Sequence, residues 1–571
     1  ILQKTPDSAT RRFNVFLVCG CTPLHLHTFV RAHLQLLLPD YQVNLGAGLY
    51  GDCAGSLERA RNARPDAIAV VLEWEDFDPR LGIRRLGGWS PRKLDEIVST
   101  VRARMQDFHR AIEAAASVAP TAICLPTLPL PPVSHRPGWE ASPFEFGLRE
   151  SAATFAGGVL RIPNVRVVSP QRLDAKSPLA ERLDVKAALL TGFPYRTGHA
   201  SVLGELLARL LKPASPKKGL ITDLDDTLWR GLLGEVGVNG VTWDLDHSSH
   251  AHGLYQQLLA ALAEAGILLG VASKNDPAQV EEAFRREELL VNKDRLFPVK
   301  VHWGRKSESV RDILGTWNIG ADSVVFIDDS PLELAEVKAA YPAMECLAFP
   351  VDDDAAVYVL LEQLRDLFGK PQILEEDRIR LDSIRSAAAL SSERTQHEGL
   401  SDGFLSQVDA AVTVSFTKEP PDPRALELVN KTNQFNLNGR RYTEGSWSAF
   451  LKDAATFLMV VTYQDKYGSL GKIAVLGGRR EGPRVLLNTW VMSCRAFARR
   501  VEHRCLEVSF DRFGVEEIVL DFEPTARNQP LQEFLAQFQE AGNGHVSRLS
   551  RNSFLKKCPP LFHKVKILHH E

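Results

Sequence analysis

The stretch Gly-Leu-Ile-Thr-Asp-Leu-Asp-Asp-Thr-Leu, residues 219–228, decides the fold of the middle of the chain. Residues 219–224, apolar apart from Thr222 and Asp223, are expected to form a buried β-strand. Asp223 stands near the tip of that strand, Asp225 follows two residues later, and Thr227 two residues beyond that. Open α/β sheets place their sites at the carboxyl ends of their strands, so the stretch predicts an α/β fold with a polar site here.

The spacing of these three side chains, DxDxT, resembles the acidic loop of the haloacid-dehalogenase (HAD) phosphatase superfamily. The resemblance implies that Asp223 attacks phosphorus and that Asp225 protonates the leaving oxygen and later activates water. Thr227 is expected to order the loop. Because acidic turns are common, the assignment depends on the motifs that follow along the chain.

Polar residues follow the next apolar runs in the order that the resemblance requires. Ser273 ends the next buried strand, where its hydroxyl can hold a phosphoryl oxygen, and Asn275 beside it is expected to bind substrate. Lys306 lies in Trp-Gly-Arg-Lys-Ser-Glu and supplies a cation that can neutralise the transferring phosphate. The alternative is that these are solvated loop residues at the edge of a sheet.

A carboxylate pair, Asp328 and Asp329, ends another apolar run. Carboxylates suit Mg²⁺, which takes one or two of them while it keeps several waters. Together with the resemblance this predicts Mg²⁺ as the cofactor, bound by Asp223, Asp225 and Asp328.

The amino-acid sequences of four segments point to one branch of this superfamily. The segments are Asp-Leu-Asp-Asp-Thr-Leu-Trp-Arg-Gly (223–231), Ala-Ser-Lys-Asn-Asp-Pro (272–277), Trp-Gly-Arg-Lys-Ser-Glu-Ser (303–309) and Val-Phe-Ile-Asp-Asp-Ser-Pro (325–331). Together they resemble the FkbH-like branch of HAD proteins, which acts in polyketide biosynthesis. Members of that family load a three-carbon unit from 1,3-bisphosphoglycerate, remove its phosphate and pass glycerate as a thioester to an acyl carrier protein. The resemblance extends over nearly the whole chain and is most specific in the HAD part.

Apolar runs alternate with helical stretches along the chain and predict three α/β domains. Residues 1–212 resemble an SGNH hydrolase-like α/β domain, with a parallel sheet whose strands are expected at 13–18, 67–72, 122–125 and 165–168. Residues 213–372 are expected to form a HAD Rossmann-like domain. Residues 373–571 are expected to hold a linker helix and a GNAT-like mixed α/β domain, with a helix over 493–509.

Length and composition agree with a large globular protein. A chain of 571 residues is too long to fold around one hydrophobic core. Its composition, 44% hydrophobic and 24% charged residues, excludes a collagen-like or largely disordered protein. The formal net charge of −3 gives no reason to expect nucleic acid as a partner. No apolar run approaches the ~20 residues that span a bilayer, and no signal segment opens the chain, so we expect a cytoplasmic protein without membrane contact. The start at Ile1 favours a segment excised from a larger synthase.

A phosphatase site cannot carry a thioester, so the resemblance requires a nucleophilic thiol, and Cys21 is the first candidate among eight cysteines. It stands at a strand-to-helix turn, where SGNH hydrolases place their serine and where a helix N-terminus favours a thiolate. His199 resembles the base of those folds, although Arg196 stands where they usually have an aspartate. Asp184 or Glu73 could orient His199. The alternative for Cys21 is a buried structural thiol.

Cys494 is the rival candidate. It stands in Ser-Cys-Arg, wording that also resembles the FkbH-like family, and Arg495 is expected to bind substrate there. The residues that follow, 499–502, look like a degenerate form of the pantetheine-binding turn of GNAT acyltransferases, where amides at a helix N-terminus bind pyrophosphate. The glycines of that turn are missing, so coenzyme A binding stays open. The alternative is a packed cysteine at the start of a helix.

Two further features fit a carrier partner. The amide-rich stretch 430–436 with Asn433, and Asn528 beyond a later strand, mark either a capped turn or a site that binds glycerate or pantetheine. Arginines gathered within 479–504 would suit an acidic carrier protein, while a solvated basic face is the plainer alternative.

These observations predict a bifunctional glyceryltransferase and phosphatase. A cysteine thiolate, Cys21 before Cys494, attacks the acyl phosphate of 1,3-bisphosphoglycerate, and the HAD site removes the 3-phosphate. The third domain then helps to present the phosphopantetheine thiol of an acyl carrier protein. Two alternatives stay open: a HAD phosphatase of a small phosphorylated metabolite, and a non-catalytic scaffold of a biosynthetic assembly line.

Overall fold

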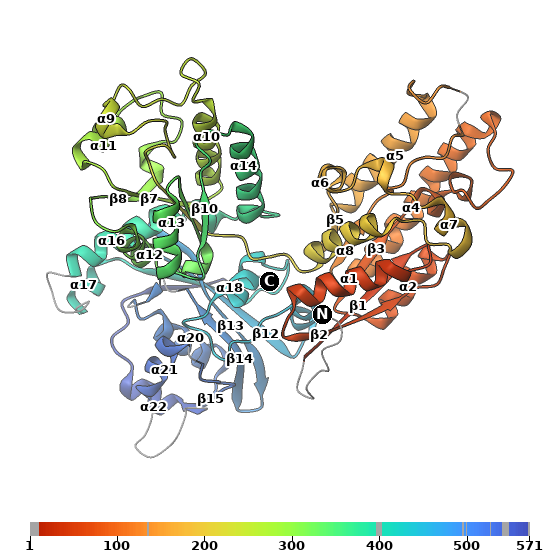
Figure 1. Cartoon of the computed structure of the whole chain (residues 1–571). Coiled ribbons are helices and arrows are strands. Elements are labelled where there is room, and N and C mark those ends of the chain that lie inside the picture. The colour runs from red at the N-terminus through yellow and green to blue at the C-terminus, as the bar shows by residue number, and fades with distance from the viewer. Residues whose placement is uncertain are drawn as a thin grey trace. The chain divides into compact units, whose positions relative to one another are not determined.

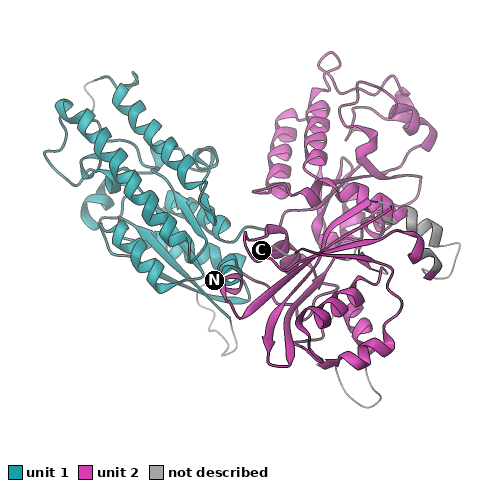
Figure 2. Cartoon of the chain, turned by 180° about the vertical axis from the view of Figure 1, so that it is seen from behind, with its two compact units in different colours: residues 1–214, 443–448 teal, residues 215–442, 449–571 magenta. Residues whose placement is uncertain are grey.

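The computed structural model describes residues 11–133, 136–394, 402–466, 468–493, 496–497, 499–525, 527–538 and 548–568. The chain divides into two compact units, residues 1–214 with 443–448 and residues 215–442 with 449–571 (Figure 2). Three β-sheets form the framework, two of them wholly parallel and one mixed, and helices connect their strands (Figure 1). Within the described residues no helix combines the length and apolarity needed to cross a bilayer.

The first unit is built on a parallel sheet in the order β2-β1-β3-β4-β5. Its strands are β1 (Arg11–Cys19), β2 (Tyr41–Ala47), β3 (Ala67–Val71), β4 (Thr121–Cys124) and β5 (Val165–Val167). Its helices are α1 (Leu24–Leu37), α2 (Cys53–Ala63), α3 (Trp74–Phe77), α4 (Leu94–Ala116), α5 (Pro143–Val159), α6 (Pro170–Lys176), α7 (Val185–Thr191) and α8 (Thr197–Leu211), and α19 (Glu444–Lys452) begins here. All residues of β3 and β4 are buried because hydrophobic clusters cover both faces of the sheet.

The strand at the edge of this sheet, β2, is absent from the sequence prediction. Of its seven residues only Val43 is fully buried, so the segment lacks the continuous apolar run of the central strands. The four predicted strands of this unit, in contrast, all coincide with observed strands to within a few residues.

The acidic loop belongs to a second parallel sheet, in the order β10-β9-β6-β7-β8. Its strands are β6 (Gly219–Thr222), β7 (Leu268–Ser273), β8 (Leu296–Val301), β9 (Val324–Asp328) and β10 (Glu345–Ala348). Its helices are α9 (Leu233–Val236), α10 (His250–Glu264), α11 (Pro277–Ala283), α12 (Lys306–Trp317), α13 (Pro331–Ala340) and α14 (Asp354–Phe368). From β6 the chain proceeds to one side through β7 and β8, then returns to the other side through β9 and β10. The sheet order therefore reverses beside β6, which is where α/β sheets place their sites.

The remainder of the second unit carries a mixed seven-stranded sheet in the order β16-β15-β14-β13-β12-β11-β17. Its strands are β11 (Ala411–Ser415), β12 (Thr456–Asp465), β13 (Gly468–Glu481), β14 (Arg484–Met492), β15 (Glu517–Leu520), β16 (Arg548–Ser550) and β17 (Lys564–Leu568). Its helices are α15 (Glu375–Arg378), α16 (Arg380–Arg394), α17 (Asp402–Gln407), α18 (Pro423–Lys431), α20 (Val501–Phe513), α21 (Gln529–Ala536) and α22 (Arg551–Lys557).

The predicted helix over 493–509 begins later than expected. Helix α20 starts at Val501, because Arg500 before it adopts a left-handed backbone with φ of 58° that cannot continue a helix toward the amino end.

Both sheets of the second unit are connected through the segment that follows α14. Asp377 pairs with Lys370 at 2.6 Å and with Arg380, and Arg380 donates a hydrogen bond to the carbonyl of Gly266 at 2.7 Å. Gly266 itself has φ of 81°, and a Cβ added to it would lie 2.1 Å from the carbonyl oxygen of Asp377. Only glycine fits between the end of α10 and this segment.

Replacing Gly266 by alanine is therefore expected to destabilise the second unit by about 2 kcal/mol or more, since a left-handed backbone and a steric overlap act together. Gly315→Ala in α12 is the matched control, because an added Cβ there meets open space and a helical glycine is replaced by a better helix former. Urea unfolding followed by hydrogen exchange of peptides from β6 and β7 measures both variants. Equal urea midpoints for Gly266→Ala and Gly315→Ala would contradict the close packing of Gly266 against Asp377.

Candidate functional site

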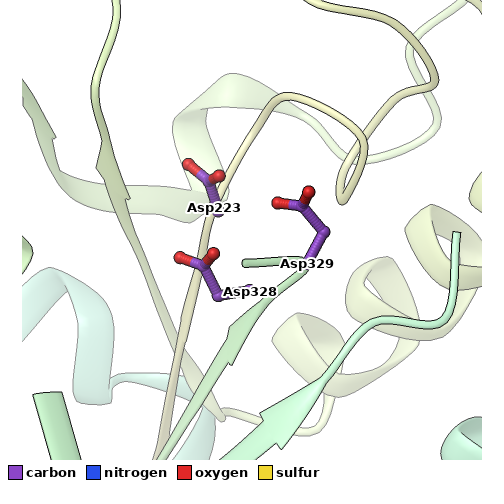
Figure 3. Close-up of side chains that lie close together, drawn as sticks. All are labelled: Asp223, Asp328 and Asp329. Atoms are coloured by element: carbon purple, nitrogen blue, oxygen red, sulfur yellow. The ribbon is translucent and has the colours of Figure 1, made fainter. Parts of the chain in front are cut away.

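Three carboxylates meet at the carboxyl ends of β6 and β9. One oxygen each from Asp223, Asp328 and Asp329 lies within 4.8 Å of the others, as Figure 3 shows for their side chains. Asp223 is held at the tip of β6 by its backbone amide, which donates to the carbonyl of Ile327 on β9 at 3.0 Å. Pairing of two buried strands thus brings acidic residues that are about a hundred positions apart in sequence into one cluster.

Lys306 lies at the centre of this acidic group. Its ammonium Nζ is 2.9 Å from Asp223 Oδ2 and 2.6 Å from Asp328 Oδ2, and it also pairs with Glu333 Oε2. The side chain is 4% exposed, and it reaches the cluster because Lys306 is the first residue of α12. Glu333 was not identified from the sequence, although its position in the first turn of α13, directly after the carboxylate pair, is a usable signal.

The electrostatics of the cluster are those of crowded acids around one cation. Burial raises the pKa of Asp223 although Lys306 opposes the shift. Burial and the charge of Asp223 raise the pKa of Asp328 to about 7 and that of Asp329 to about 6. Burial lowers the pKa of Lys306, but the carboxylates of Asp223 and Asp328 raise it by more. The net pKa lies above the usual value of a lysine, so the ammonium stays charged.

The donor set fits a hard divalent cation. Four carboxyl groups, those of the cluster and Glu333, face two ammonium groups, Lys306 and Lys274, so the acidic side chains outnumber the basic ones by two. In addition, Asp223 Oδ1 is buried and has no hydrogen-bond partner within the described residues. All-oxygen ligands of this kind suit Mg²⁺.

Asp329, and not Asp225, completes the observed carboxylate group. The Asp225 carboxylate accepts a hydrogen bond from Trp229 Nε1 at 2.9 Å and does not belong to the three-carboxylate cluster. The predicted ligand set of Asp223, Asp225 and Asp328 stays a prediction, and the structure adds Asp329 to the carboxylates gathered near Asp223.

Three other predicted residues lie at the same edge of the sheet. Ser273 ends β7 and is buried, and its hydroxyl accepts a weak hydrogen bond from Asn275 Nδ2 at 3.4 Å. Thr227 is also buried, and its backbone amide and carbonyl bond to Leu224 and His252, which fixes the loop beyond the strand. The structure thus brings Asp223, Ser273 and Lys306, which the sequence predicted as site residues, to one edge of the sheet.

The first unit corrects the expected pairing of Cys21 with His199. His199 Nε2 is 3.0 Å from Thr127 Oγ1 and Nδ1 is 2.9 Å from Ser177 Oγ, so both ring nitrogens have other partners. Burial, with help from the charge of Arg182, lowers the pKa of His199 to about 3. The imidazole is therefore neutral and structural near pH 7.

The environment of Cys21 disfavours ionisation of its thiol. The residue is buried, and the neighbouring Cys19 thiol, burial itself, and the carboxylates of Asp76 and Glu73 raise its pKa well above the usual value. A thiolate at this turn is disfavoured because the negative charge would be desolvated next to acidic groups. The alternative of a buried structural thiol describes Cys21 better.

Glu73 explains why this part of the first unit is rigid. Its carboxylate accepts hydrogen bonds from the hydroxyl of Thr127 at 2.5 Å, the amides of Thr127 at 2.9 Å and Leu128 at 3.1 Å, and the hydroxyl of Tyr195 at 3.1 Å. Glu73 therefore acts on His199 through Thr127, whereas Asp184, the other expected partner, caps α7. Burial still raises the pKa of Glu73 to about 7.

In the third sheet region, Cys494 and Arg495 lie outside the described residues. Asn433 accepts a hydrogen bond from Arg441 on an exposed loop. Asn528 is buried, accepts from the Thr525 amide and donates to the carbonyls of Asn436 and Glu523. Its amide group is used to hold two loops together, so the capped-turn interpretation describes Asn528 and substrate binding does not.

Carboxylates within the chain pair with most of the arginines near 479–504 that the structure describes: Arg479 and Arg484 with Glu481, Arg499 with Asp465, Arg500 with Asp402 and Arg504 with Glu507. Because Arg479 and Arg484 share one glutamate, positive charge remains there. Binding of an acidic carrier protein by this region stays a prediction.

No protein-family profile matches the chain, and no curated protein matches it. Among solved structures, the N-terminal part of a Bacteroides fragilis protein, which contains a phosphatase domain and is complexed with Mg, is similar with 19% identity and a TM-score of 0.52. That match covers 64% of this chain and 96% of the other. A GDSL-like lipase from Parabacteroides merdae matches 36% of this chain and 99% of its own length, with 14% identity and a TM-score of 0.23. The first likeness shows that a large part of the chain shares the fold of the Bacteroides fragilis protein.

Addition of Mg²⁺ to chelator-treated protein is expected to raise the Tm by several degrees, since a ligand at a hundred times its Kd stabilises by about 2.7 kcal/mol. Asp329→Asn should lose most of this increase, whereas Asp225→Asn should keep it. Differential scanning calorimetry with and without Mg²⁺ measures the three shifts. The reverse pattern would restore Asp225 to the ligand set.

Acid should destabilise the first unit through His199. Its folded pKa of about 3 lies below the unfolded value of 6.5, so the stability it contributes is present above pH 6.5 and is lost as pH falls. Between pH 7 and pH 5 the loss is about 2 kcal/mol. His199→Gln should show a correspondingly smaller fall in urea unfolding over this range, whereas His25→Gln, an exposed control, should follow the unmodified chain. Parallel curves for all three would refute a neutral buried imidazole.

Proposed function

We propose that the chain is a HAD-type phosphatase coupled to glyceryl transfer from 1,3-bisphosphoglycerate to an acyl carrier protein. The observation that carries the phosphatase part is the buried Lys306 ammonium among the carboxylates at the tips of β6 and β9. The fold shared with a protein that contains a phosphatase domain supports it. The glyceryl part depends on the resemblance to FkbH-like proteins.

The residues at the sheet edge have the roles that phosphoryl transfer needs. Asp223, whose Oδ1 is free of hydrogen bonds within the described residues, is the nucleophile toward phosphorus. Lys306 and the hydroxyl of Ser273 stabilise the charge on the phosphoryl oxygens. Asp225, oriented by Trp229, donates a proton to the leaving oxygen and then takes one from water. Mg²⁺, when held by Asp223, Asp328 and Asp329, supplies further neutralisation of the phosphoryl charge.

The acyl group requires a thiol, and we assign it to Cys494 in place of Cys21. Burial helps to raise the pKa of every described cysteine for which a shift is resolved, which makes these thiols poor nucleophiles: Cys21, Cys53, Cys124, Cys346, Cys505 and Cys558. In the sequence Cys494 follows β14 and precedes α20 in the Ser-Cys-Arg wording of the FkbH-like family.

In the proposed sequence of steps the Cys494 thiolate attacks the carbonyl carbon of 1,3-bisphosphoglycerate and releases the acyl phosphate as inorganic phosphate. At the HAD site Asp223 then attacks the phosphorus of the 3-phosphate, and the 3-oxygen of the glyceryl thioester leaves as a hydroxyl protonated by Asp225. Water hydrolyses the aspartyl phosphate to inorganic phosphate and restores Asp223. The pantetheine thiol of the carrier finally takes the glyceryl group and returns the thiol to Cys494. We further propose that the three sheets act as SGNH-like, HAD-like and GNAT-like domains, and that the protein works in the cytoplasm.

A phosphatase of a small phosphorylated metabolite, without acyl transfer, is the second candidate. The hydrogen-bond partners of both His199 ring nitrogens favour it, because they leave the predicted Cys21–His199 pair without a base. The scaffold alternative has no comparable support, since the cluster around Lys306 holds unneutralised buried acids that a scaffold does not need.

Intact-protein mass spectrometry after incubation with 1,3-bisphosphoglycerate, generated in place from 3-phosphoglycerate, ATP and phosphoglycerate kinase, tests the order of steps. The unmodified chain should carry a glyceryl adduct. Asp223→Asn should carry an adduct heavier by one phosphoryl group, because acylation proceeds and phosphate removal does not. A dephosphorylated adduct on Asp223→Asn would refute the HAD assignment, and carrier-independent phosphate release with no adduct would favour the second candidate.

The same experiment assigns the thiol. Cys494→Ser should abolish the adduct, while Cys21→Ser should retain it. Cys346→Ser, a half-buried cysteine on β10, is the matched control and should also retain it. An adduct that survives in Cys494→Ser and disappears in Cys21→Ser would return the acyl group to the first unit.

A further inference from the structure

A second lysine stands beside the phosphoryl site and has no part in the steps proposed above. Lys274 directly follows Ser273 at the end of β7, and its Nζ lies 2.8 Å from Glu333 Oε1. The other oxygen of the same carboxylate, Glu333 Oε2, contacts Lys306 Nζ. One carboxylate therefore bridges two ammonium groups at the edge of the sheet.

The two lysines differ in what they can still bind. Lys306 is buried and already contacts three carboxylates, whereas the Lys274 side chain is 38% exposed and pairs only with Glu333 among the described residues. An ammonium has three donors, so Lys274 has hydrogen bonds left to donate toward solvent or a ligand. Lys274 is thus the accessible cation of the pair.

The backbone around Lys274 is held in place before any ligand binds. The carbonyl of Ser273 accepts from the His302 amide at 3.1 Å, and Asn275 bonds to the Ser273 hydroxyl. Asp276 then caps α11 by accepting from the amides of Ala278 and Gln279. Contacts on both sides of Lys274 leave only its side chain to adjust, which lowers the entropy lost on binding.

The charge around Glu333 favours an anionic or oxygen-rich ligand. Burial would raise the pKa of Glu333, but hydrogen bonds from Lys274 and Lys306 lower it below its usual value. The one carboxylate of Glu333 pairs with two ammonium groups, and one of these, Lys306, also pairs with Asp223 and Asp328. The exposed ammonium of Lys274 is the positive charge at this edge that is least neutralised.

We propose that Lys274 is a substrate-binding residue that selects phosphorylated hydroxy acids and their thioesters, and that Glu333 positions both lysines. Lys306 serves the phosphoryl group, while Lys274 donates hydrogen bonds to the carboxyl, carbonyl or hydroxyl oxygens on the neighbouring carbons of the same substrate. This inference rests on the proposed phosphatase function and adds to it the residue that selects the substrate.

Steady-state phosphate release in the presence of Mg²⁺ from two compounds, 3-phosphoglycerate and phenyl phosphate, tests the proposal. Phenyl phosphate has the ester but no further oxygens. Lys274→Met should reduce kcat/KM for 3-phosphoglycerate at least tenfold more than for phenyl phosphate, mainly through KM, since only 3-phosphoglycerate loses a hydrogen bond from a charged donor. Lys274→Arg should recover part of the loss.

Lys300→Met is the matched control. Lys300 lies on β8 of the same sheet, is 34% exposed and pairs with one carboxylate, that of Asp312 at 3.4 Å. It does not contact the site residues named above, so Lys300→Met should leave kcat/KM for both compounds unchanged. Glu333→Gln should lower kcat for both compounds, because Lys306 and Lys274 lose their shared partner.

The outcomes separate this inference from the function on which it rests. Equal losses for both compounds in Lys274→Met, or no loss for either, would overturn the role of Lys274 while the phosphatase proposal stands. Absence of phosphate release from both compounds by the unmodified chain would overturn the phosphatase proposal and this inference with it.

Discussion

The ammonium of Lys306 is the interaction on which the rest of the site depends. It lies within 2.9 Å of Asp223 and 2.6 Å of Asp328 and also contacts Glu333, so one buried cation holds residues from β6, β9 and α13 together. Removal of one member of such a group leaves uncompensated buried charge, which commonly costs 3–5 kcal/mol. The same crowding of acids that requires the lysine also creates the negative charge that suits Mg²⁺.

The two parallel sheets use their carboxyl ends differently. In the first unit, Glu73 accepts four hydrogen bonds and both nitrogens of His199 have partners, so that network is satisfied and serves rigidity. In the second unit, Asp223 Oδ1 is buried and has no hydrogen-bond partner within the described residues, and the carboxylates of the cluster together with Glu333 outnumber the two lysines. Because an unsatisfied buried polar group is costly, a ligand that contacts this oxygen would be favoured.

Sequence patterns identified the central strands of sheets that are covered on both faces, because such strands are continuous apolar runs. They missed β2, where only Val43 is fully buried, and placed the start of α20 too early because the left-handed Arg500 carries no signal in its residue type. In the site, motif order singled out Asp223, Ser273, Lys306 and the pair Asp328 and Asp329, although Asp225 was named as a metal ligand in place of Asp329. The bridging role of Glu333 was not predicted, since it depends on how α12 and α13 meet the strand ends.

The sequence by itself determined the α/β class, the strand ends at which the acidic residues stand, and the type of chemistry that those residues can support. These follow from local apolar runs and from the spacing of side chains along one segment. Only the tertiary structure decided which carboxylates share Lys306, that His199 is neutral and engaged elsewhere, and that most of the described arginines near 479–504 are paired. The physical reason is that charge, burial and hydrogen-bond satisfaction depend on contacts between distant segments, and residue type alone does not specify them.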